Sequence, residues 1–102
     1  MVVTKEVFNR MFPGDFVKVK TIGQLIDTGW VERDGIYVHE NCWAGVIPDA
    51  MKSHLGKLCR IKEFRQHPVT QETFVILEED EHEFCYTIEM MHELYPLTRG
   101  MS

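Results

Sequence analysis

The sequence predicts a mainly β fold with short helices, in which the strands form a small, partly open barrel. Two transitions from a turn into a strand carry this prediction. A Pro-Gly-Asp turn signal at residues 13–15 leads directly into residues 16–20, where valines alternate with lysines. Gly56 leads in the same way into residues 57–62. Because side chains alternate across a strand, each segment is expected to bury one face and expose the other.

The composition predicts a single globular domain over residues 1–102. The chain is long enough for a hydrophobic core, and its 44% hydrophobic and 26% charged residues are close to globular averages. No stretch approaches the roughly 18 apolar residues that span a bilayer, and the first residues lack the apolar core of a signal peptide. We therefore expect a cytoplasmic protein without membrane contact. The three cysteines, an odd number without a CxxC pair, are expected to be reduced thiols.

The first half of the chain is expected to alternate short helices with short strands. Thr4 is placed to cap a short helix that runs through Phe12 and is ended by Pro13. Thr21 is placed to cap a helical turn over residues 22–27. Three further segments complete this half: extended pieces at residues 30–31 and 35–38, and a loop at residues 41–46 that carries Trp43.

The second half is expected to hold a helix from Pro48, three strands and a last helix. The strands are predicted at residues 57–64, 73–78 and 84–88. The last helix is expected to be capped by Thr87 and to carry Met90, Met91 and Leu94. The predicted domain therefore divides into an N-terminal helix in residues 1–12, a barrel in residues 14–91 and a C-terminal tail in residues 92–102. An α+β roll, in which helices cover one face of a sheet, is the alternative.

Several turn and core residues match a known pattern. The matching segments are residues 14–20, 51–62, 74–80 and 84–91. Together they resemble a group of small SH3-like β-barrel proteins of unassigned function that are encoded by bacteriophages and bacterial genomes. The resemblance implies an SH3-like partly open barrel and a phage or prophage origin. It implies no functional residues, because the group has none established.

The charges are distributed unevenly along the chain, whose formal net charge is −5 and whose pI is about 5.5. Residues 52–65 hold five basic side chains and one acidic one, whereas residues 72–93 hold eight acidic side chains and no lysine or arginine. One interpretation is that the basic strand pairs with the acidic strands beside it. The other is that residues 78–83 mimic phosphates and inhibit a nucleic-acid-binding protein. The acidic balance argues against nucleic acid as the partner, because phosphate binding needs lysine and arginine.

A zinc site is the sharpest hypothesis for chemistry. His39-x2-Cys42 and His54-x4-Cys59 supply four ligands of the types that zinc prefers. Against this site, each pair mixes histidine with cysteine, and Cys59 lies in a predicted strand where a thiol commonly packs as an apolar residue. The sequence predicts no bound cofactor. It contains no nucleophile-elbow, Walker or dinucleotide-binding pattern, so we expect a protein that is not an enzyme.

Aromatic side chains supply a second candidate site: Trp30, Tyr37, Trp43 and Tyr95. SH3-like barrels often bind peptides with such rings, and core packing is the alternative. We expect Trp43 to be partly exposed. The predicted function is a small cytoplasmic module that binds a partner protein, with a small-molecule or zinc-binding protein that uses residues 39–59 as the alternative. Self-association is expected through apolar residues of the terminal segments: Val7, Phe8, Met90, Met91 and Leu94.

Overall fold

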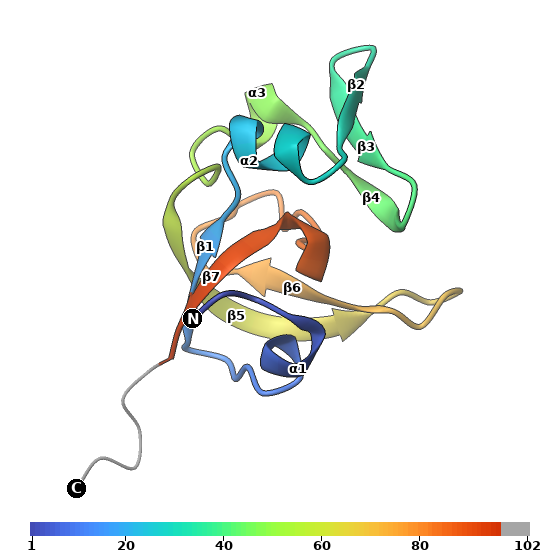
Figure 1. Ribbon diagram of the computed structural model, residues 1–102. Helices are drawn as coiled ribbons and strands as arrows, with labels where there is room; N and C mark the ends of the chain where they lie inside the picture. Colours follow the sequence, from blue (N-terminus) through green and yellow to red (C-terminus); the bar gives the residue numbers. More distant parts are fainter. Residues whose placement is uncertain (97–102) are drawn as a thin grey trace, which may run out of the picture.

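Seven strands in two antiparallel sheets, joined by short helices, make up the protein (Figure 1). The computed structural model describes residues 1–96. The larger sheet has the strand order β6-β5-β1-β7 and the smaller one the order β2-β3-β4. The strands are β1 Phe16–Val19, β2 Val31–Arg33, β3 Ile36–His39, β4 Cys42–Val46, β5 Leu58–Gln66, β6 Thr73–Leu77 and β7 Met91–Tyr95. The helices are α1 Lys5–Phe8, α2 Ile22–Asp27, α3 Pro48–Met51 and the 3₁₀ helix η1 Ile88–Met90.

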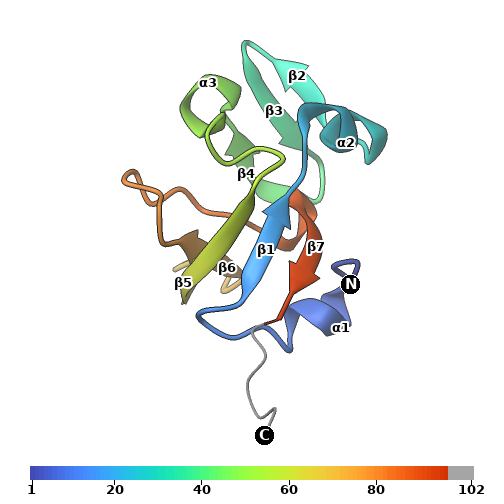
Figure 2. The ribbon, with the colours of Figure 1, turned by 90° about the vertical axis from the view of Figure 1, so that its left-hand side faces the viewer.

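The two sheets lie at different ends of the molecule. In Figure 2, β5, β1 and β7 lie side by side, while the smaller sheet sits above them together with α2 and α3. The short helix α1 lies at the opposite end of the larger sheet (Figures 1 and 2). The strands and short helices of residues 1–96 confirm the prediction of a mainly β fold with short helices. These strands do not close into a barrel.

One hydrophobic core joins the two sheets and the helices. The alternating residues of β1 predicted to be buried, Val17 and Val19, are no more than 1% exposed. They pack in the same cluster as Ile61 of β5, Val46 of β4 and Leu25 of α2. The rest of the buried cluster consists of Phe8, Met11, Trp30, Met51, Cys59, Val75, Leu77, Tyr86, Met90, Met91 and Leu94.

The first two helices begin at the residues that the sequence predicts, but α1 ends at Phe8, so the prediction that it runs through Phe12 is wrong. The hydroxyl of Thr4 accepts a hydrogen bond from the backbone N–H of Val7, at 3.2 Å. At α2 the hydroxyl of Thr21 accepts from the N–H of Gln24, and the side chain of Gln24 accepts from the N–H of Thr21 in return. These bonds satisfy N–H groups that have no partner inside a helix. None of the helices in residues 1–96 is long and apolar enough to cross a bilayer.

The prediction of a loop at residues 41–46 is wrong, because this segment forms β4. β4 pairs with β3 through Tyr37 opposite Val46 and His39 opposite Cys42, and the register shifts between these two pairs. Ala44 and Gly45 have low strand propensity, but the pairing of β4 with β3 stabilises the strand. Trp43 therefore lies on a strand, which fixes its position.

The predicted last helix follows Thr87 as expected, but it is only the 3₁₀ helix η1, and its predicted continuation and the tail from residue 92 are wrong, because residues 91–95 form β7. The spacing of Met91 and Leu94 is helical, yet both are buried in a strand. The reason is an irregularity in the pairing with β1: Lys18 lies opposite Glu93, but the next residue, Val19, lies opposite Met91. The extra residue shifts the alternation by one, so two side chains three positions apart reach the same core.

The basic strand and the acidic turn that follows β6 neutralise each other, as the first interpretation of the charge pattern expects. Arg60 lies 3.7 Å from Glu78. Lys62 lies 3.1 Å from Glu83, and Arg65 lies 3.3 Å from the same carboxylate. Two of the acidic residues in the segment 78–83 are therefore engaged by β5.

Asp80 organises the turn after β6, and its replacement should destabilise the fold. Asp80 is 6% exposed, and its two carboxylate oxygens accept the backbone N–H groups of His82 and Phe84 at 3.1 and 2.8 Å. We expect Asp80→Ala to lower the free energy of unfolding by about 2 kcal/mol, because two N–H groups lose a charged acceptor. Chemical denaturation measures this loss. The neighbouring exposed residue gives the control: Glu81→Ala should change stability by less than about 0.5 kcal/mol. Equal effects of the two changes would contradict the assigned role of Asp80.

Candidate functional site

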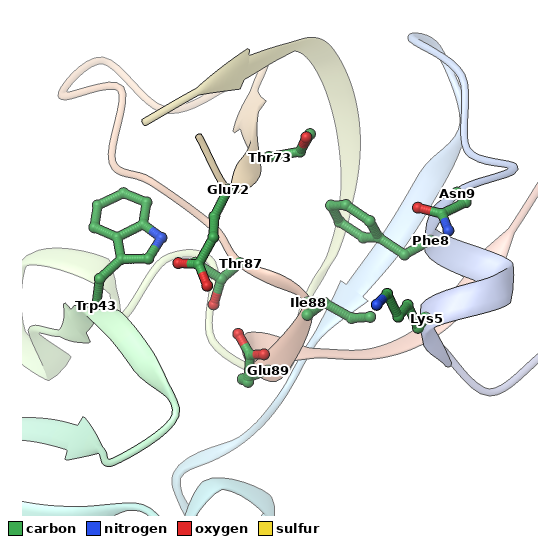
Figure 3. Close-up of a pocket in the computed structure, with 9 residues that line it drawn as sticks. All are labelled: Lys5, Phe8, Asn9, Trp43, Glu72, Thr73, Thr87, Ile88 and Glu89. Atoms are coloured by element: carbon green, nitrogen blue, oxygen red, sulfur yellow. The ribbon is translucent and has the colours of Figure 1, made fainter. Parts of the chain in front are cut away.

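A cavity of about 440 Å³ opens between α1, β4, the start of β6 and η1. We call it the Trp43 cavity. Figure 3 shows the indole of Trp43 on one side and the side chains of α1 on the other, with the residues of η1 between them. The nine lining residues are Lys5, Phe8, Asn9, Trp43, Glu72, Thr73, Thr87, Ile88 and Glu89.

The cavity exists because two neighbouring chain segments separate at this point. Val75 of β6 exchanges two backbone hydrogen bonds with Tyr86, at 2.9 and 3.0 Å. Immediately after Tyr86 the chain turns into η1 instead of continuing along β6. Backbone groups alternate along an antiparallel strand, so the N–H and C=O of Thr73 face the same edge as those of Val75. The cavity is the space between this end of β6 and η1.

The position of Trp43 in the wall is fixed by two aromatic neighbours. Its ring centroid lies 4.5 Å from that of His67 and 5.3 Å from that of Phe74, with the second pair in an edge-to-face arrangement. His67 is itself held in place, because its Nδ1 accepts the backbone N–H groups of Val69 and Thr70, both at 3.1 Å. Trp43 is half-buried, which confirms its predicted partial exposure. Its indole N–H is buried and has no acceptor among residues 1–96.

Two carboxylates face this aromatic wall. In Figure 3 the carboxylates of Glu72 and Glu89 lie between the indole of Trp43 and helix α1. Within the part of the chain that the structure describes, neither forms an ion pair. Glu89 is half-buried, and its charge helps to raise the pKa of the Cys42 thiol, although burial is the larger cause. With Lys5 as the single base of the lining, the cavity carries a net negative charge.

Comparison of the chain with protein-family models, with curated proteins and with solved structures finds no match.

The structure separates the four aromatic residues that the sequence proposes as a binding site. Trp30 is 2% exposed and lies in the core with its ring beside His39, so the prediction is wrong for Trp30. Tyr37 is half-buried against the core from β3. Tyr95 is 42% exposed at the end of β7, where its hydroxyl donates to Glu93. Of these four residues, Trp43 is the one that lines the Trp43 cavity.

The four residues of the zinc hypothesis are also not brought together. Within residues 1–96, no group of three or more histidine, cysteine, aspartate and glutamate side chains is arranged to hold a metal ion. Each candidate ligand has its own neighbour instead: His39 lies against the carbonyl of Thr28, Cys42 against the hydroxyl of Thr87, His54 against the hydroxyl of Ser53, and Cys59 donates to the carbonyl of Lys57.

The apolar residues expected to support self-association lie mostly inside the core. Phe8 is 8% exposed, and the side chains of Met90, Met91 and Leu94 are no more than 3% exposed. Val7 is half-buried and packs against the same cluster. These five residues therefore offer little exposed apolar surface for self-association, whereas Met1, Val2 and Phe12 of the N-terminal segment are more than half exposed.

The sequence did not indicate Glu72, Thr73, Glu89 or Lys5 as site residues. These residues come from three segments that lie far apart in the chain and meet only around the cavity. The uneven charge pattern was the one available signal, because Glu72 and Glu89 belong to the acidic segment 72–93 but have no basic partner on β5.

Proposed function

We propose that the protein is a binding module that holds an extended segment of a partner protein in the Trp43 cavity, with a lysine or arginine of that segment placed between Glu72 and Glu89. One observation carries the proposal: the cavity combines an aromatic wall with two carboxylates that have no ion-pair partner in residues 1–96. A lysine or arginine side chain suits both features, because its charge pairs with carboxylates and is attracted to an indole face. The net charge of −5 favours the approach of a basic segment.

The backbone of β6 supports an extended segment as the occupant. The edge of β6 at Thr73 borders the cavity and is not covered by the segment that pairs with Val75. A partner strand added at this edge gains main-chain hydrogen bonds, which supply affinity without sequence preference. Its alternate side chains then face the cavity, where Trp43 and the carboxylates supply the selectivity.

The charges elsewhere favour this cavity over the acidic turn as the functional site. In the turn, Glu78 and Glu83 are paired with basic residues of β5, and Asp80 is buried. A phosphate mimic needs a row of exposed and unpaired carboxylates, and within residues 1–96 only Glu79 and Glu81 of this turn are in that state, so we do not propose one. The SH3-like assignment, the phage or prophage origin and the cytoplasmic location belong to the same proposal. The first two rest on the resemblance of residues 14–91, and the cytoplasmic location rests on the absence of a signal-peptide pattern in the first residues of the sequence.

Fluorescence titration tests the proposal, with Trp43 as the reporter. The Trp30→Phe variant leaves Trp43 as the single tryptophan and removes an indole N–H that has no acceptor in the described residues. We expect short capped peptides with one lysine among threonine and valine to change its emission. The same peptides with glutamine in place of lysine should bind about tenfold more weakly.

Matched variants separate specific binding from general charge. Combining Glu72→Gln with Glu89→Gln should remove the preference for lysine over glutamine peptides. Glu32→Gln, which removes an exposed carboxylate outside the cavity, should leave that preference unchanged. Equal binding of both peptides to the single-tryptophan protein would reject the proposed recognition of a basic residue. Failure of every peptide to bind would reject the module itself.

A further inference from the structure

A second cavity, of about 380 Å³, adjoins the Trp43 cavity and has the opposite charge. We call it the Lys20 cavity. It shares Lys5, Ile88 and Glu89 with the Trp43 cavity, so the two hollows meet along η1. Its other lining residues are Val2, Val3, Thr4, Lys20, Thr28, Met91 and His92.

Three basic side chains line the Lys20 cavity against one acidic side chain. The bases are Lys5, Lys20 and His92, and the acid is Glu89. His92 lies 3.3 Å from Glu93, a carboxylate outside the lining, whereas neither lysine forms an ion pair within residues 1–96. The charge of this cavity is therefore positive, although the protein as a whole is acidic.

Lys20 is the central group of this cavity. Its ammonium donates to the hydroxyl of Thr28 at 3.2 Å, and this hydroxyl also lies 2.8 Å from the carbonyl of Gln24. Lys20 is half-buried, and burial lowers its pKa, with a smaller opposing effect from Glu89. A half-buried ammonium with one neutral acceptor is poorly compensated, and an anion beside it supplies the missing stabilisation.

We infer that the Lys20 cavity binds a carboxylate of the same partner segment that occupies the Trp43 cavity. This inference rests on the proposed function and adds a second point of recognition to it. The partner segment then carries a lysine or arginine in the Trp43 cavity and an aspartate or glutamate in the Lys20 cavity. Two charges of opposite sign also fix the direction of the bound segment, because reversing it places each charge against its like.

Peptides with one lysine and one glutamate at increasing separations test the inference in the Trp30→Phe protein. At the separation that matches the two cavities, replacing the glutamate by glutamine should weaken binding about tenfold. In the Lys20→Met variant the glutamate and glutamine peptides should bind equally, and Lys20→Arg should restore the difference. Lys52→Met, which removes an exposed ammonium outside both cavities, should leave the difference intact.

The outcomes distinguish the inference from the proposed function. Binding of lysine peptides that is insensitive to the glutamate at every separation would overturn the inference and leave the Trp43 cavity as a site for basic segments. The inference would also be overturned if Lys20→Met weakened the binding of the glutamate and glutamine peptides by the same factor, because the difference in affinity between them would then remain. If inorganic phosphate abolished the affinity difference between the glutamate and glutamine peptides but left the lysine-only peptide unaffected, the anion subsite would stand, since the competitor occupies the Lys20 cavity only.

Discussion

The Trp43→Ala variant is expected to bind lysine-bearing peptides about 30-fold or more weakly than the unaltered protein. A half-buried tryptophan in the wall of a cavity is typical of residues that dominate binding energy. Trp43 supplies the aromatic wall, and its contact with Phe74 also joins that wall to β6. Its removal therefore widens the cavity beside the two carboxylates. Isothermal titration calorimetry with the lysine peptide measures the loss directly.

A more conservative change separates the ring from its polar group. Trp43→Phe keeps an aromatic ring beside His67 but lacks the indole N–H, which has no acceptor among the described residues. We expect an intermediate loss of about tenfold, because the smaller phenyl ring leaves part of the cavity wall unfilled. Trp43→Ala should also lower the free energy of unfolding by about 2 kcal/mol, because two ring contacts are lost. Binding is therefore compared under conditions in which circular dichroism shows each variant to be folded.

Tyr95 provides the matched control, because it is another aromatic residue of the original candidate site. It is 42% exposed and lies outside the lining of both cavities. Tyr95→Ala should leave peptide affinity within about twofold of the unaltered value. Equal losses in Trp43→Ala and Tyr95→Ala would contradict the assignment of the site to the Trp43 cavity.

The fold could be predicted where local rules and tertiary packing agree. The cap residues Thr4 and Thr21 begin helices, and the alternating valines of β1 are buried, because each pattern depends on a few neighbouring residues. β7 was missed because its helix-like spacing of apolar residues is compatible with a strand only if the pairing with β1 contains an extra residue. That irregularity is a property of two strands far apart in the chain.

The candidate site was predicted only in part for a related reason. Trp43 is followed by Ala44 and Gly45 in the sequence, and the prediction that it is partly exposed is confirmed. The sequence contains no signal that places Glu72 and Glu89 on the opposite side of the same cavity. The separation of Glu89 from the basic residues of β5 follows from the turn of the chain into η1 after Tyr86. A charge pattern shows which residues need partners, but the topology decides which of them remain without one.

Alkaline solution is expected to destabilise the protein strongly, because two acidic groups are buried in neutral form. Cys59 is 4% exposed, and burial, helped by the charges of Glu79 and Asp80, raises the pKa of its thiol to about 11. Tyr86 is 1% exposed, and burial raises the pKa of its phenol well above the ordinary value of 10.0. The hydroxyl of Tyr86 has no hydrogen-bond partner among residues 1–96.

The sign of the pH dependence follows from proton binding in the two states. Below pH 9 both groups are neutral whether the chain is folded or unfolded, so they add no pH dependence. Above the ordinary thiol pKa of 9.0 the unfolded chain releases the proton of Cys59, while the folded protein keeps it until about pH 11. The unfolded state then binds fewer protons, and the free energy of unfolding falls as the pH rises. The loss from Cys59 is about 2 kcal/mol, and the loss from Tyr86 continues at higher pH.

Two variants assign this alkaline loss to its groups. Tyr86→Phe keeps the ring and removes a buried hydroxyl without a partner, so at neutral pH its stability should equal or exceed that of the unaltered protein by up to about 1 kcal/mol. Cys59→Ala should cost about 1 kcal/mol at neutral pH but make the fall between pH 9 and 11 shallower, while the raised pKa values of the Cys42 and Cys85 thiols and the Tyr86 phenol still contribute to that fall. The lowered pKa of Lys20 makes the free energy of unfolding rise with pH, which is the opposite direction. Lys20 is present in all three proteins, so its contribution cancels when their stability curves are subtracted. A stability curve of the unaltered protein that stays level from pH 8 to 11 would mean that neither group is held neutral by the fold, since a thiol and a phenol that ionise equally in both states contribute no slope.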